Sequence, residues 1–169
     1  MSDSLSHAIA NFDGADFTAL EAAVADHFPS ADDLAGLVVL VQVGDLRAQL
    51  AAAWALGRLV ARGLPLLPAE RRALLRCLDE DRAWQVKERL CLAVRYLRTP
   101  PDVALTAAAS LERLAAHDHR NVRLAALDGL AALAERFPQL QEWSDRAVER
   151  ALDDTAPSVR AKARVLLRG

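Results

Sequence analysis

The chain has 169 residues, 53% of them hydrophobic, and its 21 basic residues nearly balance 23 acidic ones. This length and composition allow a sizeable core and exclude a disordered protein, while a net charge of -2 excludes an overall basic field for nucleic acid. No apolar run approaches the ~20 residues of a membrane span, and residues 1–12 lack the features of a secretory signal. We therefore expect a cytoplasmic protein with no membrane partner.

The N-terminal segment, residues 1–30, is predicted to cap the rest of the chain. Within it, residues 16–28 place Phe17, Leu20, Val24 and Phe28 at helical spacing. A stack of helices needs a cover at its open end, so we expect one capping helix here.

From residue 31 onward, an aliphatic residue followed by a basic one opens an amphipathic segment four times. The four dipeptides are Leu46-Arg47, Val86-Lys87, Val122-Arg123 and Val159-Arg160, separated by 40, 36 and 37 residues. Apolar residues recur four, eight and eleven positions later, on one helical face, and Trp54 is one of these predicted core residues. The pattern predicts four helical pairs, at about 31–62, 68–98, 101–136 and 140–168, in one array over 31–169.

The first helix of each pair begins with residues typical of helix N-termini. Ser30 precedes two aspartates, Pro68 precedes a glutamate two positions later, and Pro101 precedes an aspartate. A proline or a carboxylate in a first helical turn suits the free N–H groups and the helix dipole there. These residues therefore mark the helix starts.

The last repeat resembles the HEAT-repeat family. The segment Asp154-Thr155-Ala156-Pro157-Ser158-Val159-Arg160, followed by Ala163, is similar to the family consensus. Asp81 stands at the same distance before Val86 as Asp154 does before Val159, whereas the third repeat has His117 there and the first has Val41. The resemblance covers residues 31–168 and implies an all-α right-handed superhelix, or solenoid, whose second helices line a concave side.

The resemblance also implies a ladder of aspartate and basic residues between neighbouring repeats. In this ladder Asp81 and Asp154 help to order Lys87, Arg123 and Arg160. Exposed pairs of this kind contribute little, so apolar stacking must hold the repeats together.

The outward arcs of the second helices are rich in alanine and leucine, which is unusual for a surface that meets only water. One interpretation is an open groove for an amphipathic partner helix or an extended peptide. The other is that superhelical curvature or the N-terminal segment covers these positions and makes them a second core. The candidate partner-binding residues are Gln49, Ala52, Arg89, Leu92, Arg95, Tyr96, Leu124, Asp128 and Lys162.

Residues for catalysis or metal binding form no convincing set. Cys77 and Cys91 lie on apolar stretches and are interpreted as buried, reduced thiols. The turn 117–119 carries two histidines, but residues two apart in a turn rarely bind one ion together. We expect no metal, no cofactor and no catalytic residue.

The sequence thus predicts a non-catalytic scaffold or adaptor that binds a protein segment on its concave face, with self-association left open. The alternative is a bilin lyase-like HEAT-repeat enzyme, because an apolar concavity with Tyr96, Arg89 and Arg95 can accept a tetrapyrrole. A nucleic-acid-binding protein is a weaker alternative, because the groove is lined largely by small and apolar residues rather than by basic ones.

Overall fold

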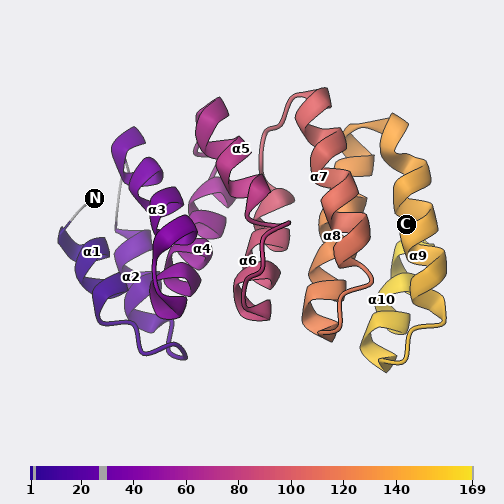
Figure 1. Cartoon of the computed structure of the whole chain (residues 1–169), viewed down its shortest axis with the longest axis horizontal. Helices are drawn as coiled ribbons and strands as arrows, with labels where there is room; N and C mark the ends of the chain where they lie inside the picture. Colours follow the sequence, from indigo (N-terminus) through magenta and orange to yellow (C-terminus); the bar gives the residue numbers. More distant parts are fainter. Residues whose placement is uncertain (2, 27–29, 169) are drawn as a thin grey trace. The chain divides into compact units, whose positions relative to one another are not determined.

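The computed structural model describes residues 1, 3–26 and 30–168, and within these residues every regular element is helical. The helices form two compact units, Met1–Arg98 and Thr99–Gly169, hereafter unit 1 and unit 2. This confirms the predicted all-α class and the succession of helical pairs (Figure 1). The segment 27–29, which includes Phe28, lies outside the described residues.

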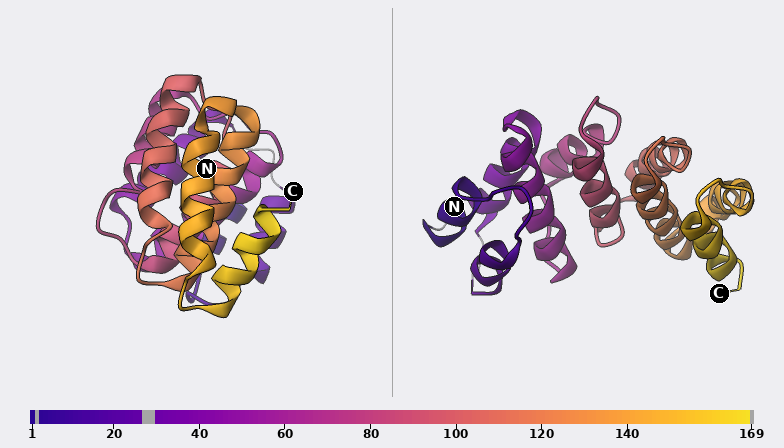
Figure 2. Two further views of the ribbon diagram at one scale, coloured as in Figure 1. Left: turned by 90° about the vertical axis from the view of Figure 1, so that its right-hand side faces the viewer. Right: turned by 90° about the horizontal axis from the view of Figure 1, so that it is seen from below.

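Unit 1 contains a short N-terminal hairpin followed by two helical pairs. The hairpin is α1 (Asp3–Ala10) and α2 (Thr18–Ala25), where the sequence predicted one helix. The pairs are α3 (Ala31–Val43) with α4 (Leu46–Ala61), and α5 (Pro68–Arg76) with α6 (Trp84–Val94). Helix α4 is central, because it packs against α1, α2, α3 and α6. The two hairpin helices lie side by side at the N-terminal end of this unit (Figures 1 and 2).

Unit 2 contains the other two pairs. These are α7 (Pro101–Leu114) with α8 (Arg120–Arg136), and α9 (Gln141–Leu152) with α10 (Pro157–Leu166); a 3-10 turn, Pro138–Leu140, precedes α9. Helix α8 packs on α7, α9 and α10, and α10 crosses beside α9 (Figure 2). Helix α8 thus contacts its own partner and both helices of the next pair.

Local sequence explains where the helices begin. The Ser30 side chain accepts from the backbone N–H of Asp33, and the Asp33 carboxylate accepts from the Ser30 N–H, which closes a capping box before α3. Helices α5, α7 and α10 begin at Pro68, Pro101 and Pro157, where a missing N–H costs nothing. The predicted helix starts are therefore confirmed.

The core columns are confirmed in part. The position four residues after each dipeptide start is buried in all four repeats, at Leu50, Leu90, Ala126 and Ala163. The start itself is buried in three repeats, but Leu46 is 50% exposed. Helix α4 has neighbours on several sides, so one amphipathic stripe does not describe its burial.

Two glycines of unit 1 should respond to alanine in opposite ways. At Gly44 a Cβ atom would lie 2.6 Å from the Leu40 backbone oxygen, so Gly44→Ala should destabilise unit 1 by about 1–2 kcal/mol. At Gly36, inside α3, a Cβ atom meets nothing within 4 Å, so Gly36→Ala should stabilise it by about 0.5–1 kcal/mol. Urea unfolding followed by circular dichroism measures both changes, and equal signs would contradict this placement.

Candidate functional site

A cavity of about 220 Å³ lies between α4 and α6 in unit 1, and we call it the α4–α6 cavity. Alanine and glycine form part of its wall, and larger aromatic, aliphatic and arginine side chains complete it. The lining residues are Ala53, Trp54, Gly57, Arg58, Ala61, Arg89, Leu92, Ala93, Arg95 and Tyr96. The cavity therefore combines apolar surface with three guanidinium groups.

Aromatic rings and arginines stack beside this cavity. The Phe17 ring lies on Trp54 with a centroid distance of 5.3 Å and an interplanar angle of 29°. The Arg89 guanidinium lies 5.3 Å from the Phe17 centroid, and that of Arg58 lies 5.3 Å from the Trp54 ring. Such cation–π contacts hold long side chains in place. Phe17, immediately before α2, thus links α4 to α6.

Helix α2 is tied to α4 by arginines near the end of α4. The Arg58 side chain forms an ion pair with Glu21, and Arg62 donates to the Val24 backbone oxygen at 2.6 Å. A second cavity of about 440 Å³ lies between these helices and shares Trp54, Arg58 and Ala61 with the α4–α6 cavity. The Trp54 and Arg58 side chains therefore have a hollow on either side.

The end of α6 exposes Tyr96. Prolines at 100 and 101 oppose continuation of the helix, and the last turn tightens: Tyr96 N–H donates to the Ala93 oxygen at 3.0 Å. Tyr96 is 47% exposed, although it lines the cavity, and Arg95 lies 5.9 Å from its ring centroid. A partly exposed tyrosine beside arginines is typical of a binding surface.

The structure groups only some of the candidate partner-binding residues. Arg89, Leu92, Arg95 and Tyr96 all line the α4–α6 cavity. Gln49 lies at the start of α4, away from the cavity lining, and donates to the Gly44 backbone oxygen at 2.8 Å.

Ala52 requires a correction, because it is 0% exposed and cannot line an open groove. Helices α1 and α2 pack on α4, and Leu56 and Leu59 on the same predicted outward arc are also fully buried. Because α1, α2, α3 and α6 all pack on α4, this part of the predicted outward arc is covered and interior in unit 1. This was the other interpretation that the sequence left open.

The remaining candidates belong to unit 2. Leu124 is half-buried on α8, and Asp128 on α8 pairs with Lys162 on α10 at 2.8 Å. This ion pair joins the two second helices of unit 2. Its exposed fractions of 23% and 31% leave it accessible to solvent.

Trp54 was misassigned by the helical period, which placed it in the core. It is only partly buried and lines both cavities beside α4. Arg58 and Gly57, also in the cavity lining, were not candidates either. The sequence signal that could have pointed to Trp54 was the aromatic residue Phe17. The two rings belong to distant parts of the chain, however, and residue spacing alone does not show that they stack.

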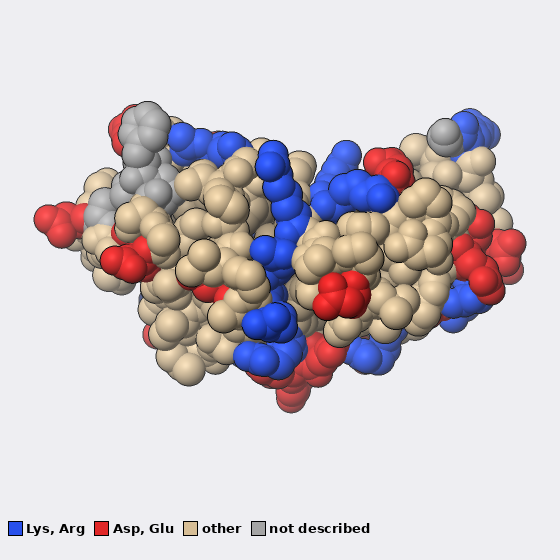
Figure 3. All heavy atoms as spheres, turned by 90° about the horizontal axis from the view of Figure 1, so that it is seen from above, with Lys and Arg blue, Asp and Glu red and all other residues tan. Residues whose placement is uncertain are grey.

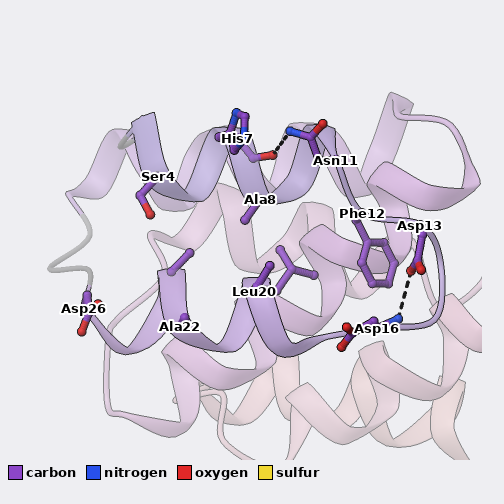
Figure 4. A pocket seen from close by; sticks show the side chains of 12 residues that line it. Ser4, His7, Ala8, Asn11, Phe12, Asp13, Asp16, Leu20, Ala22 and Asp26 are labelled. Atoms are coloured by element: carbon purple, nitrogen blue, oxygen red, sulfur yellow. Dashed lines mark hydrogen bonds between the residues drawn. The ribbon is translucent and has the colours of Figure 1, made fainter.

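A further cavity, of about 530 Å³, lies between α1 and α2 (Figure 4). Its polar groups already serve the local backbone: Asp13 accepts from the N–H groups of Ala15 and Asp16, and the Asn11 amide donates to the His7 oxygen. Hydrogen bonds from Asp16 and Ala15 lower the pKa of Asp13. The polar groups of this cavity therefore stabilise the connection between α1 and α2.

The predicted ladder is present in unit 2. The Arg123 guanidinium pairs with Asp154 at 2.7 Å, and these side chains are 11% and 12% exposed. Arg123 also donates to the backbone oxygens of His117 and Asp118, and Arg160 repeats this pattern with Asp154 and Thr155. Burial raises the pKa of Asp154, but hydrogen bonds from Arg123 and Ala156 outweigh it, and the net pKa lies below the usual value.

The ladder is not repeated at Asp81, which is exposed and has no ion pair among the described residues. Its neighbour Arg82 instead donates to the backbone oxygens of Val41 at 2.8 Å and Gln42 at 3.2 Å. Arg82, in the turn of the second pair, thus binds the C-terminal end of α3 without an ion pair to Asp81.

In the described part of the chain, the histidines of the turn 117–119 and the cysteines, which have catalytic or metal-binding potential, either accept backbone hydrogen bonds or are buried. The Nδ1 atoms of His117 and His119 accept backbone N–H groups at the start of α8. Cys77 and Cys91 are free and buried, as predicted, and burial raises the pKa of Cys91 to about 12. Across residues 1, 3–26 and 30–168, no three His, Cys, Asp or Glu side chains are grouped to hold a metal ion. His27 lies outside the described residues.

Among the described helices, none is long and apolar enough to cross a membrane. On the face drawn in Figure 3, uncharged atoms predominate, and several basic side chains lie together near the middle.

No protein-family model and no curated protein matches the chain. Among solved structures, it is similar to a chain from the complex of CpcE and CpcF of phycocyanin lyase from Nostoc sp. PCC7120. The two are 19% identical, the TM-score is 0.75, and the match covers 97% of this chain and 98% of the other. The likeness shows a shared fold, so this chain has an all-helical, HEAT-like architecture.

Proposed function

We propose that this protein is a non-catalytic interaction module that binds a helix or an extended segment of a partner protein at the α4–α6 cavity. One observation carries the proposal: Trp54, Leu92 and Tyr96 surround a hollow together with three arginines. Tryptophan, tyrosine and arginine dominate the binding energy of protein interfaces when they cluster in a pocket.

The size of the cavity favours a protein segment over a free small molecule. Sites for drug-sized ligands have volumes of roughly 300–1,000 Å³. The α4–α6 cavity has about 220 Å³, enough for an anchoring side chain while the rest of the segment lies outside. The similar solved structure is itself a complex of two proteins, which supports a protein partner.

The proposal places this interaction in the cytoplasm. Cys77 and Cys91 are free and buried, and a reducing compartment keeps such thiols unpaired. The unit 2 candidates Leu124, Asp128 and Lys162 belong to the proposal only as a second contact area.

Replacing Tyr96 by alanine should abolish partner capture without loss of folding, because Tyr96 is 47% exposed and its aromatic ring is a binding anchor. Tagged wild-type protein, Tyr96→Ala and Leu92→Asp are compared in pull-downs from the native host with mass spectrometry. Circular dichroism and the melting temperature should stay near wild type.

Leu105→Ala is the matched control for this test, because Leu105 is 49% exposed on α7 in unit 2. A protein captured by wild type and Leu105→Ala but lost with Tyr96→Ala supports the proposal. Capture by all variants alike counts against it, and a collapse of folding in Tyr96→Ala would assign the ring to the core.

A bilin lyase-like activity is the second candidate, favoured by the shared fold with a chain from a phycocyanin lyase complex. Arg89 and Arg95 can pair with propionate groups, and Trp54 can stack on a pyrrole ring. Mixing purified protein with a bilin should then shift the bilin absorbance, and Arg89→Gln should reduce the shift. An unchanged spectrum would remove this candidate.

Nucleic-acid binding and self-association can be tested with two short measurements. The net charge is -2, which gives no overall attraction for a polyanion, so DNA should cause no salt-dependent gel shift. Val165 and Leu167 on the last turns of the chain are 64% and 55% exposed and can pair two copies. Light scattering measures the molar mass of the protein in solution and so shows whether two copies associate.

A further inference from the structure

The charges around the α4–α6 cavity are unbalanced. Three arginines line it, and none of its lining residues is acidic. Arg58 already pairs with Glu21, whereas Arg89 and Arg95 form no ion pair with any residue in the described part of the chain. The cavity wall therefore carries two positive charges that no acidic residue of the described part pairs with.

Arg89 is held in place but incompletely satisfied. Its guanidinium rests on the Phe17 ring, and its Nε atom is buried without a hydrogen-bond partner among the residues that the structure describes. Leaving a buried donor unpaired is costly, and a bound acceptor that reaches it regains that cost. Because arginine presents its donors in a planar fork, a carboxylate is the group that fits it best.

The apolar half of the cavity is next to these charges. Trp54 and Leu92 line it, and Gly57 leaves space because a Cβ atom there would meet only the Ala93 Cβ, at 3.9 Å. A volume of about 220 Å³ accepts an aromatic or a large aliphatic side chain. A single ligand that uses both halves must have an acidic group adjacent to an apolar one.

We propose that the α4–α6 cavity recognises a partner segment in which an Asp or Glu lies beside an aromatic or large aliphatic residue. Its carboxylate binds Arg89 and Arg95, and its apolar side chain is seated against Trp54 and Leu92 above Gly57. This inference rests on the proposed function, since it defines the chemistry of the segment that the module binds.

The test is a selection of random 12-residue peptides displayed on phage, with the purified full chain as the target. Enriched peptides are synthesised with a fluorescent label, and their affinities are measured by anisotropy. We expect them to share an acidic residue next to an aromatic or aliphatic one. Changing that acid to its amide, or Arg89→Gln in the protein, should weaken binding at least tenfold. Raising the salt concentration should weaken it further.

Two matched pairs of variants identify the site. Gly57→Trp fills the cavity and should abolish binding, whereas Gly57→Ala adds one methyl group in ordinary contact and should retain it. Arg72→Gln removes an exposed charge on α5 in the same unit and should leave the affinity within twofold of wild type. Circular dichroism confirms that each variant is folded.

Three results are possible. Acidic-apolar peptides that depend on Arg89 and on an open Gly57 support the inference. Peptides that depend on Gly57 but carry no acid overturn the inference and leave the proposed function standing. No enriched peptide, or binding that Gly57→Trp does not change, overturns both.

Discussion

Replacing Ala52 by aspartate should destabilise unit 1 by about 4 kcal/mol or more. Ala52 is 0% exposed within α4, and α1, α2, α3 and α6 all pack on this helix. A carboxylate placed there has no room and must be desolvated or protonated. Because whole domains are stable by only about 5–15 kcal/mol, this single change brings unit 1 close to unfolding.

The measurement is urea unfolding followed by tryptophan fluorescence. Trp54 and Trp84 belong to unit 1, so a Trp143→Phe background restricts the signal to that unit. Ala61→Asp is the control, because Ala61 is exposed on the same helix, and it should shift the free energy by less than about 1 kcal/mol. If Ala52→Asp unfolds at the same urea concentration as the wild type, position 52 must be open to solvent.

Replacing Asp154 by asparagine should cost unit 2 about 2–3 kcal/mol. The change removes the charge that pairs with Arg123 at 2.7 Å, at a site where both side chains are nearly buried. Breaking one partner of such a pair leaves the other charge uncompensated, although Arg123 keeps the backbone oxygens of His117 and Asp118. The loss of stability should therefore be smaller than for a buried ion pair whose remaining partner has no other hydrogen bonds.

Unfolding monitored by Trp143 in a Trp54→Phe, Trp84→Phe background measures this cost in unit 2. Asp153→Asn is a close control, because the neighbouring carboxylate is exposed and forms no ion pair among the described side chains. If both variants unfold at the same urea concentration, the ladder pair contributes nothing to stability.

The stability that Asp154 provides should depend on pH in one direction. Its pKa in the folded protein lies below the value of about 3.9 for an unfolded aspartate. The stabilisation is therefore complete above pH ~4 and is lost as the pH falls through the folded pKa. Wild type and Asp154→Asn should consequently become similar in stability in acid, while at neutral pH they stay apart.

Most of the helical framework could be predicted from the sequence, because its signals are local. The capping residues at Ser30, Pro68 and Pro101 define helix starts through groups within one turn of the chain. The recurring apolar position marks the same buried face in all four repeats. The Asp154–Arg123 pair was also within reach, because the resemblance to the HEAT-repeat family implies a ladder of aspartate and basic residues.

The candidate site needed tertiary structure. Phe17 and Trp54 are far apart in the chain, and nothing in the period of either helix indicates that their rings stack. The packing of α1, α2, α3 and α6 around α4 also buries Ala52, although its position along α4 is typical of an exposed face. Periodicity describes one face of one helix, whereas the burial of α4 depends on every helix that packs around it. The sequence thus determined the repeating helical pairs, and only the packing of distant segments decided which surface remains available for binding.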